Sequence, residues 1–271
     1  MDRGDYEAAI ELIRPRAERG DAKAQSKLGS LYESGRGVTQ DSFEALRWYR
    51  LAAEQGEAHA QAKLGSFYES GRSVSQDDAE AVRWYRKAAE QGDAQAQSSL
   101  GSYYYSGTVV PQDSAEAMRW YRKAAEQGYA VAQCNLGSLY AKGQGVPQDD
   151  AEAVRWYRLA AEQGYAKAQN KLGSLYYSGS GVPQDSVEAV KWQRKAAEQG
   201  YADAQLLLGL LYSSGKGVPQ DFVQARMWLS LAAVAGSTAA SSILNLYDTK
   251  MTPNQIAEAN RLAREWRPRK P

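Results

Sequence analysis

The sequence predicts an all-α repeat protein, a solenoid of about six 36-residue units that are each a pair of antiparallel helices. The first observation is a glycine that recurs every 36 residues, at Gly29, Gly65, Gly101, Gly137, Gly173 and Gly209. The second is a tryptophan with the same spacing, at Trp48, Trp84, Trp120, Trp156, Trp192 and Trp228. Between these landmarks, apolar residues follow helical spacing. A fixed period in the thirties with helical spacing is typical of stacked αα-hairpins.

The 271 residues are interpreted as a single solenoid domain, because stacked units share one continuous core. We expect an N-terminal capping helix over 1–20, six repeats over 21–236 and C-terminal capping helices over 237–271. Lys and Arg total 33 against 32 acidic residues, so the net charge of +1 argues against general attraction to nucleic acid or an anionic membrane. No apolar run of about 18 residues suggests a membrane span. We therefore expect a soluble monomer.

The third unit illustrates how each hairpin is built. Its first helix is expected from Asp93 to about Ser106, and its second helix begins near Asp113. Trp120 and Tyr121 lie on the apolar stripe of the second helix. In the linking loops, glycine ends one helix and an aspartate such as Asp149 is placed to cap the next. Both loops are short, so successive helices are expected to run antiparallel.

The recurring helical glycine needs a physical reason, because glycine inside a helix costs roughly 0.5–1 kcal/mol relative to alanine. We expect Gly101 to allow a close approach of helix backbones opposite Ala124 and Ala125. Trp120 is expected to fill the space between neighbouring hairpins. On this interpretation Trp120→Ala costs about 3–5 kcal/mol of stability.

A longer phrase carries a family resemblance. Ala-x-Ala-Gln-x-x-Leu-Gly-x-x-Tyr-x-x-Gly-x-Gly-Val-x-Gln-Asp-x-x-x-Ala-x-x-Trp-Tyr-x-x-Ala-Ala-x-x-Gly occurs, complete or nearly so, six times between about 21 and 236. It resembles the Sel1-like repeat family, a relative of the tetratricopeptide repeats. The resemblance implies a right-handed superhelix of αα-hairpins and a non-enzymatic adaptor or scaffold that binds proteins or peptides. The segments 2–20 and 251–266 resemble the opening and closing helices of such proteins.

The resemblance also bears on location. The chain as given begins without a signal-peptide pattern, which favours the cytoplasm. Bacterial members with this opening are often exported, however, so a periplasmic or secreted location stays open.

Catalytic and metal chemistry find little support in the residues. The single histidine, His59, occupies a variable surface position, and one histidine with one cysteine makes a zinc site of the usual type untenable. No cofactor is expected. Some cysteine-rich relatives of this family are linked to β-lactam binding, but the Ser-x-x-Lys match at Ser213–Lys216 lacks its companion motifs and is interpreted as coincidence. A β-lactam-interacting hydrolase is therefore the disfavoured alternative, and a purely structural module of a larger assembly is another.

The partner surface is expected on the first helix of each hairpin, which lines the concave face of stacked αα units. The outward positions are counted as 23, 26, 27, 30, 33 and 34 and their equivalents every 36 residues. In the third to fifth units they carry tyrosine, amide and small side chains, which suit peptide recognition. An unused, solvated groove is the alternative. The candidate partner-binding residues are Gln95, Ser98, Ser102, Tyr105, Val131, Cys134, Asn135, Lys142, Asn170, Lys171 and Tyr177.

Two further expectations concern single features. Cys134 is predicted to be a small, partly exposed side chain on this surface. The sixth unit carries Leu206, Leu207 and Leu210 where other units are mostly polar. These leucines either form an exposed interface or are buried beneath the closing helix, through Ile256, Leu262 and Trp266, and we favour burial because terminal units need a cap.

Overall fold

The computed structural model describes residues 3–269, and every regular element in that range is an α-helix. The chain divides into two compact units between residues 129 and 130. The first unit contains α1 (Arg3–Glu18), α2 (Ala22–Ser34), α3 (Ser42–Glu54), α4 (Ala58–Ser70), α5 (Asp78–Glu90), α6 (Ala94–Ser106) and α7 (Ser114–Glu126). The second contains α8 (Ala130–Lys142), α9 (Asp150–Glu162), α10 (Ala166–Ser178), α11 (Ser186–Glu198), α12 (Ala202–Ser214), α13 (Phe222–Val234), α14 (Thr238–Asp248) and α15 (Pro253–Glu265).

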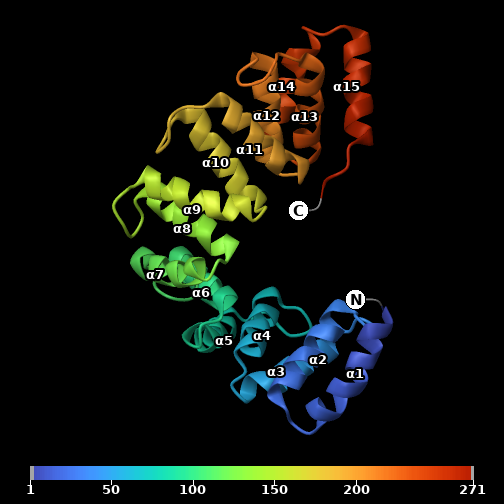
Figure 1. The fold of residues 1–271 in the computed structure, drawn as a ribbon, viewed down its shortest axis with the longest axis vertical. Coiled ribbons are helices and arrows are strands. Elements are labelled where there is room, and N and C mark those ends of the chain that lie inside the picture. Colours follow the sequence, from blue (N-terminus) through green and yellow to red (C-terminus); the bar gives the residue numbers. More distant parts are fainter. Residues whose placement is uncertain (1–2, 270–271) are drawn as a thin grey trace. The chain divides into compact units, whose positions relative to one another are not determined.

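Within each unit, consecutive helices up to α14 pack against each other as hairpins, and α15 packs against α13 (Figure 1). The helix that opens each repeat, from α2 to α12, is called the A helix below, and the helix that follows it is the B helix. The predicted all-helical hairpin repeat of about 36 residues is confirmed. None of the helices in the described part of the chain combines the length and apolar character that crossing a bilayer requires.

The helix ends follow the loop chemistry of the sequence. Every B helix has an aspartate at its N-cap whose side chain accepts hydrogen bonds from the first turn; Asp149, for example, accepts from the Glu152 amide at 2.9 Å. Such caps stabilise a helix by about 1 kcal/mol, because they satisfy amides that have no intrahelical partner. Most A helices end in a left-handed glycine such as Gly107, with φ of 71°. The predicted caps and stops are therefore confirmed.

The helical glycines allow a close approach, but the partner differs from the prediction. A Cβ atom on Gly101 would lie 2.9 Å from the ring of Tyr121 and 3.2 Å from the carbonyl oxygen of Ala117. The nearest groups are thus Tyr121 and Ala117, whereas the prediction named Ala124 and Ala125. The tyrosine one position after the tryptophan lies across the glycine, because helical geometry brings it to the inner side of the hairpin.

Tyr121 is also more deeply buried than Trp120, although the prediction gave the core position to the tryptophan. Tyr121 is buried, whereas Trp120 is only half-buried and has the Lys123 ammonium group 4.3 Å from its ring centroid. Trp120 therefore packs at the edge of the core and Tyr121 packs at its centre.

At the C-terminal end, Leu206 and Leu207 of the sixth repeat pack in two different clusters. Leu206 packs in a cluster with Leu229 and Ala240, to which Ile243 and Tyr247 of α14 also contribute. Leu207 belongs to a separate cluster that includes Leu262 and Trp266. Leu206, Leu207 and Leu210 are each half-buried. The predicted burial beneath the closing helix is confirmed for Leu207, which packs in one cluster with Leu262 and Trp266. Leu206 packs against α14 instead.

Candidate functional site

Three of the predicted surface residues are buried. Ser98 is 4%, Cys134 0% and Asn170 6% exposed, so none of them can contact a partner. The predicted partial exposure of Cys134 is wrong, and burial raises the pKa of its thiol to about 11 against the opposing charges of Lys167 and Lys171.

These three side chains are buried because a helical glycine follows each of them by about one turn. Each of these positions precedes the helical glycine by three residues and so lies on the same face of the A helix. In the fourth repeat, a Cβ atom on Gly137 would lie only 3.1 Å from the ring of Tyr157. Cys134 therefore lies inside the hairpin.

The other candidates lie at the surface but belong to different units. Gln95, Ser102 and Tyr105 are on α6 in the first unit, where Ser102 is exposed and the other two are half-buried. Ser102 lies 3.0 Å from the Tyr121 hydroxyl. Val131, Asn135 and Lys142 on α8 and Lys171 and Tyr177 on α10 belong to the second unit. Each unit therefore carries its own candidate surface.

In the second unit, a cavity of about 490 Å³ lies between α8, α9 and α10. Lys142 and Lys171, both predicted, line this cavity together with Lys167, which the prediction did not include. The Tyr157 hydroxyl donates to Ser138 Oγ at 2.9 Å within the same wall. The complete lining is Ser138, Ala141, Lys142, Tyr157, Lys167, Lys171, Ser174 and Leu175, which includes no acidic side chain. The charged side chains of this lining are therefore all basic.

Tyr177, on the same A helix, is held by contacts along the chain. The Lys216 ammonium group donates to the Tyr177 hydroxyl at 3.2 Å and lies 5.4 Å from the ring centroid. Gln184 donates to the Tyr177 carbonyl oxygen at 2.7 Å. The ring is therefore pre-positioned, which lowers the entropic cost of using it as a contact.

In the first unit, Glu33 forms a charged cluster with three side chains. The Arg72 guanidinium lies 2.5 Å and the Lys63 ammonium 3.2 Å from its carboxylate, and the Tyr49 hydroxyl donates to it at 2.8 Å. Burial alone opposes ionisation of Glu33, but these hydrogen bonds and charges prevail and lower the pKa of the carboxyl group. The cluster is fully paired and links the first two repeats.

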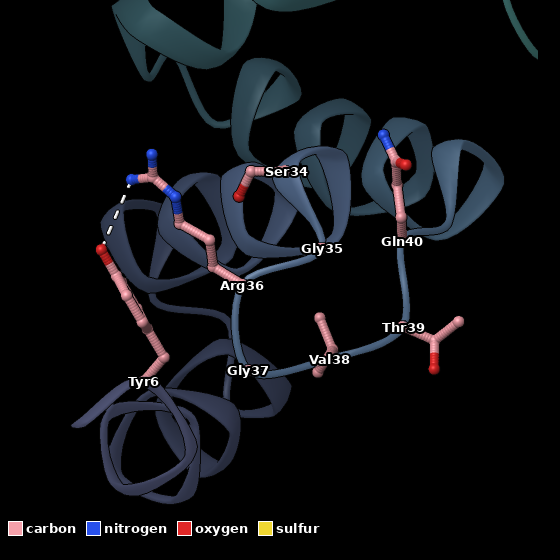
Figure 2. A pocket seen from close by; sticks show the side chains of 8 residues that line it. All are labelled: Tyr6, Ser34, Gly35, Arg36, Gly37, Val38, Thr39 and Gln40. Atoms are coloured by element: carbon pink, nitrogen blue, oxygen red, sulfur yellow. Dashed lines mark hydrogen bonds between the residues drawn. The ribbon is translucent and has the colours of Figure 1, made fainter. Parts of the chain in front are cut away.

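A larger cavity of about 800 Å³ lies beside the loop that follows α2 and was not predicted. Figure 2 shows Arg36 reaching from this loop to the hydroxyl of Tyr6 on α1, a contact of 3.5 Å. Gly37 sits so close to α1 that a Cβ atom would meet Tyr6 at 2.9 Å. The loop is thus packed onto α1, and its arginine is already bound.

The residues weighed for catalysis are apart or exposed. Ser213 Oγ donates to the Leu210 carbonyl oxygen at 2.9 Å and accepts from Tyr247, whereas the Lys216 ammonium group is bonded to Tyr177. His59 is exposed. Within residues 3–269 no group of three or more His, Cys, Asp or Glu side chains is arranged to hold a metal ion.

The helices and their 36-residue period define a helical-hairpin repeat protein. Six consecutive matches to the Sel1 repeat model, over 22–57, 58–93, 94–129, 130–165, 166–201 and 202–237, cover most of the chain. The chain belongs to the Sel1 repeat family. Sel1 repeat proteins generally mediate protein–protein interactions and are generally non-enzymatic.

Solved structures agree with this assignment. The crystal structure of c5321, a protective antigen of uropathogenic Escherichia coli with an SLR fold, is 40% identical over 94% of this chain, with a TM-score of 0.79. The match spans 56% of that protein's length. A Sel1 repeat protein from Oxalobacter formigenes is 37% identical, with a TM-score of 0.76, and the match covers 84% of this chain and 91% of that one. Among curated proteins there is no match.

Proposed function

We propose that this protein is a non-enzymatic scaffold that holds a segment of a partner protein against the A-helix surface of its repeats. The observation that carries the proposal is the cavity of the second unit, whose lining includes Lys142, Lys167 and Lys171 and no acidic side chain. A lining that carries positive and no negative side chains favours an anionic group over a cation. A carboxylate side chain of a protein partner has that charge and fits a cavity of about 490 Å³.

Tyr177 and Asn135 extend this surface along α10 and α8. Both are half-buried, and each combines contact area with hydrogen-bonding capacity. A partner segment with an acidic side chain at the lysines and apolar or polar groups on the flanking residues would therefore match the surface.

The test is a selection of peptides from a phage-displayed random library on the immobilised full chain. One enriched peptide is then measured by fluorescence anisotropy against the parent, Lys171→Ala and Tyr177→Ala. We expect each variant to weaken binding about fivefold or more, which corresponds to about 1 kcal/mol for a significant interface contact. The matched control is Lys191→Ala, an exposed lysine of a B helix that pairs with Glu188 at 2.9 Å. Parent-like affinity in both A-helix variants would overturn the proposed site.

A further inference from the structure

Glu33 and Glu69 occupy equivalent positions in the first two repeats, and their surroundings differ. The first of them is filled by the chain itself, because Glu33 of α2 receives the Arg72 guanidinium and the Lys63 ammonium group. The Cζ atom of Arg72 lies 4.2 Å from the centroid of the Phe67 ring, so this guanidinium has a carboxylate at its end and an aromatic ring beneath it.

The second position lies 36 residues further along and is not filled. Glu69 replaces Glu33 and accepts the Tyr85 hydroxyl at 2.7 Å, as Glu33 accepts Tyr49. Tyr103 replaces Phe67 as the aromatic ring. Ser99 and Thr108, however, stand where the preceding repeat has Lys63 and Arg72. The carboxylate and the ring are kept, and both cations are lost.

A cavity remains where the arginine side chain would lie. Its volume is about 350 Å³, and it is lined by Glu69, Gln76, Asp78, Ser102, Tyr103, Ser106 and Thr108. Asp78 adds a second carboxylate, which accepts the Tyr103 hydroxyl at 3.2 Å. Among the described residues, no ion pair involves Glu69 or Asp78, and no basic side chain lines the cavity.

The chemistry of this cavity selects a guanidinium over other cations. Two carboxylates facing one cavity favour a cation, and a planar guanidinium can donate to both while stacking on the Tyr103 ring. An ammonium group is compact and strongly hydrated, so it would use the ring less well. The preceding repeat shows the same combination of carboxylate and ring with a guanidinium in place.

We propose that this cavity binds an arginine side chain presented by a protein partner. The inference deepens the proposed scaffold function and rests on it for the source of the arginine. It assigns to the first unit a cation-accepting contact, beside Tyr105 on α6, which differs in charge from the lysine-lined cavity of the second unit.

The test uses three capped tripeptides, acetyl-Gly-Arg-Gly-amide and its lysine and citrulline counterparts, titrated into the isotope-labelled full chain. Amide shifts are followed by NMR. We expect saturable shifts at residues 102–108 with the arginine peptide and binding about fivefold weaker with the lysine peptide, because the stacking contribution is reduced. Citrulline is nearly the same shape without the charge, so shifts of equal size with that peptide would overturn the proposal.

Two variants sharpen the result. Thr108→Arg places the chain's own guanidinium in the cavity, as Arg72 does one repeat earlier, and should abolish the shifts while leaving thermal stability unchanged or higher. Arg72→Thr empties the first position and should add a second set of shifts around Glu33. Arginine-peptide shifts that persist in Thr108→Arg would count against the assignment. The outcome is separable from that of the scaffold proposal, because the tripeptides report on the cavity whether or not the library yields a peptide.

Discussion

Gln127 donates its side-chain amide to Gln97 Oε1 at 2.8 Å, and Gln97 donates in turn to the backbone carbonyl of Ala89 at 3.1 Å. Gln97 is 4% exposed, so its amide must be satisfied within the protein. The relationship links the C-terminal ends of α5 and α7 to α6 through one polar chain inside the stack. It recurs within the two units in the pairs Gln55 and Gln25, Gln91 and Gln61, Gln163 and Gln133, and Gln199 and Gln169.

The sixth repeat lacks this glutamine–glutamine hydrogen bond, and a substitution that restores it should stabilise the protein. Gln205 is 2% exposed, and its Oε1 atom has no hydrogen-bond partner in the described structure. Ala235 stands where the other repeats have the donor glutamine, with nearly the same backbone angles as Gln199. We expect Ala235→Gln to raise the free energy of unfolding by about 1 kcal/mol, measured by urea denaturation.

The control for this substitution is Ala235→Met, which has similar length and no amide. A methionine variant as stable as the glutamine variant would show that added apolar contact, and not the missing hydrogen bond, limits stability at this end.

A second imperfect position lies in the fifth repeat. Gln193 replaces the tyrosine of the earlier B helices and is fully buried, and its Oε1 atom is without a partner among the described residues. In the preceding repeat the Tyr157 hydroxyl donates to Ser138 at 2.9 Å, and Ser174 occupies the equivalent place for residue 193. We expect Gln193→Tyr to stabilise the protein by about 1–3 kcal/mol, because it removes a buried unsatisfied acceptor.

Thermal and urea unfolding of Gln193→Tyr and Gln193→Phe separate the contribution of the added ring from that of the tyrosine hydroxyl. The phenylalanine variant fills the space without the hydroxyl, so it should gain less than the tyrosine variant. Destabilisation by both would mean that the fifth hairpin has closed around the smaller glutamine and cannot accept a ring.

The period of the glycines and tryptophans was enough to predict the helical hairpins and their caps, because each signal is local and repeated six times. The predicted surface was less accurate, since a helical wheel assigns a face without knowing how closely the next helix approaches. Gly137 brings Tyr157 against the side of α8 that holds Cys134, and this contact buries the cysteine. The depth of an interhelical contact depends on both helices and cannot be counted from one.

The lysine-lined cavity of the second unit and the arginine-sized cavity of the first unit were not predicted, although the sequence contains a signal for each. Lys142 lies in the fourth repeat and Lys167 in the fifth, at different positions of the repeat. A comparison within one repeat therefore does not bring them together. The arginine-sized cavity depends on Thr108 replacing the arginine of the preceding repeat. Comparison of each position across all six repeats shows this replacement. The cavity follows from it once Arg72 is known to reach back to Glu33.

The contact between Gly101 and Tyr121 sets two effects against each other. Gly101→Ala gains about 0.5–1 kcal/mol of helix propensity, but its Cβ atom would lie 2.9 Å from the tyrosine ring and 3.2 Å from the Ala117 carbonyl oxygen. Overpacking of a buried contact costs about 1–3 kcal/mol, so we expect net destabilisation. The measurement is urea unfolding of Gly101→Ala with and without Tyr121→Leu, since leucine opposes glycine in the sixth repeat. Additive effects in this double-mutant cycle would show that the ring is not the obstacle.

Burial of Cys134 predicts both low reactivity and a pH dependence. The pKa of its thiol is raised to about 11 in the folded chain, whereas an unfolded cysteine titrates near pH 8.5. The folded state therefore favours the neutral thiol. Its contribution to stability is fully present below about pH 8.5 and is lost as the pH rises through about 11.

Cys134→Ala is the matched variant, because Ala62 occupies the same position in the second repeat. The difference in unfolding free energy between parent and variant should shrink from about pH 8.5 to about pH 11. At about pH 8, iodoacetamide should label the native thiol far more slowly than the urea-unfolded chain, because the thiolate forms only when the hairpin opens. Equal labelling rates in the two states would place the thiol at the surface and return Cys134 to the candidate partner-binding residues.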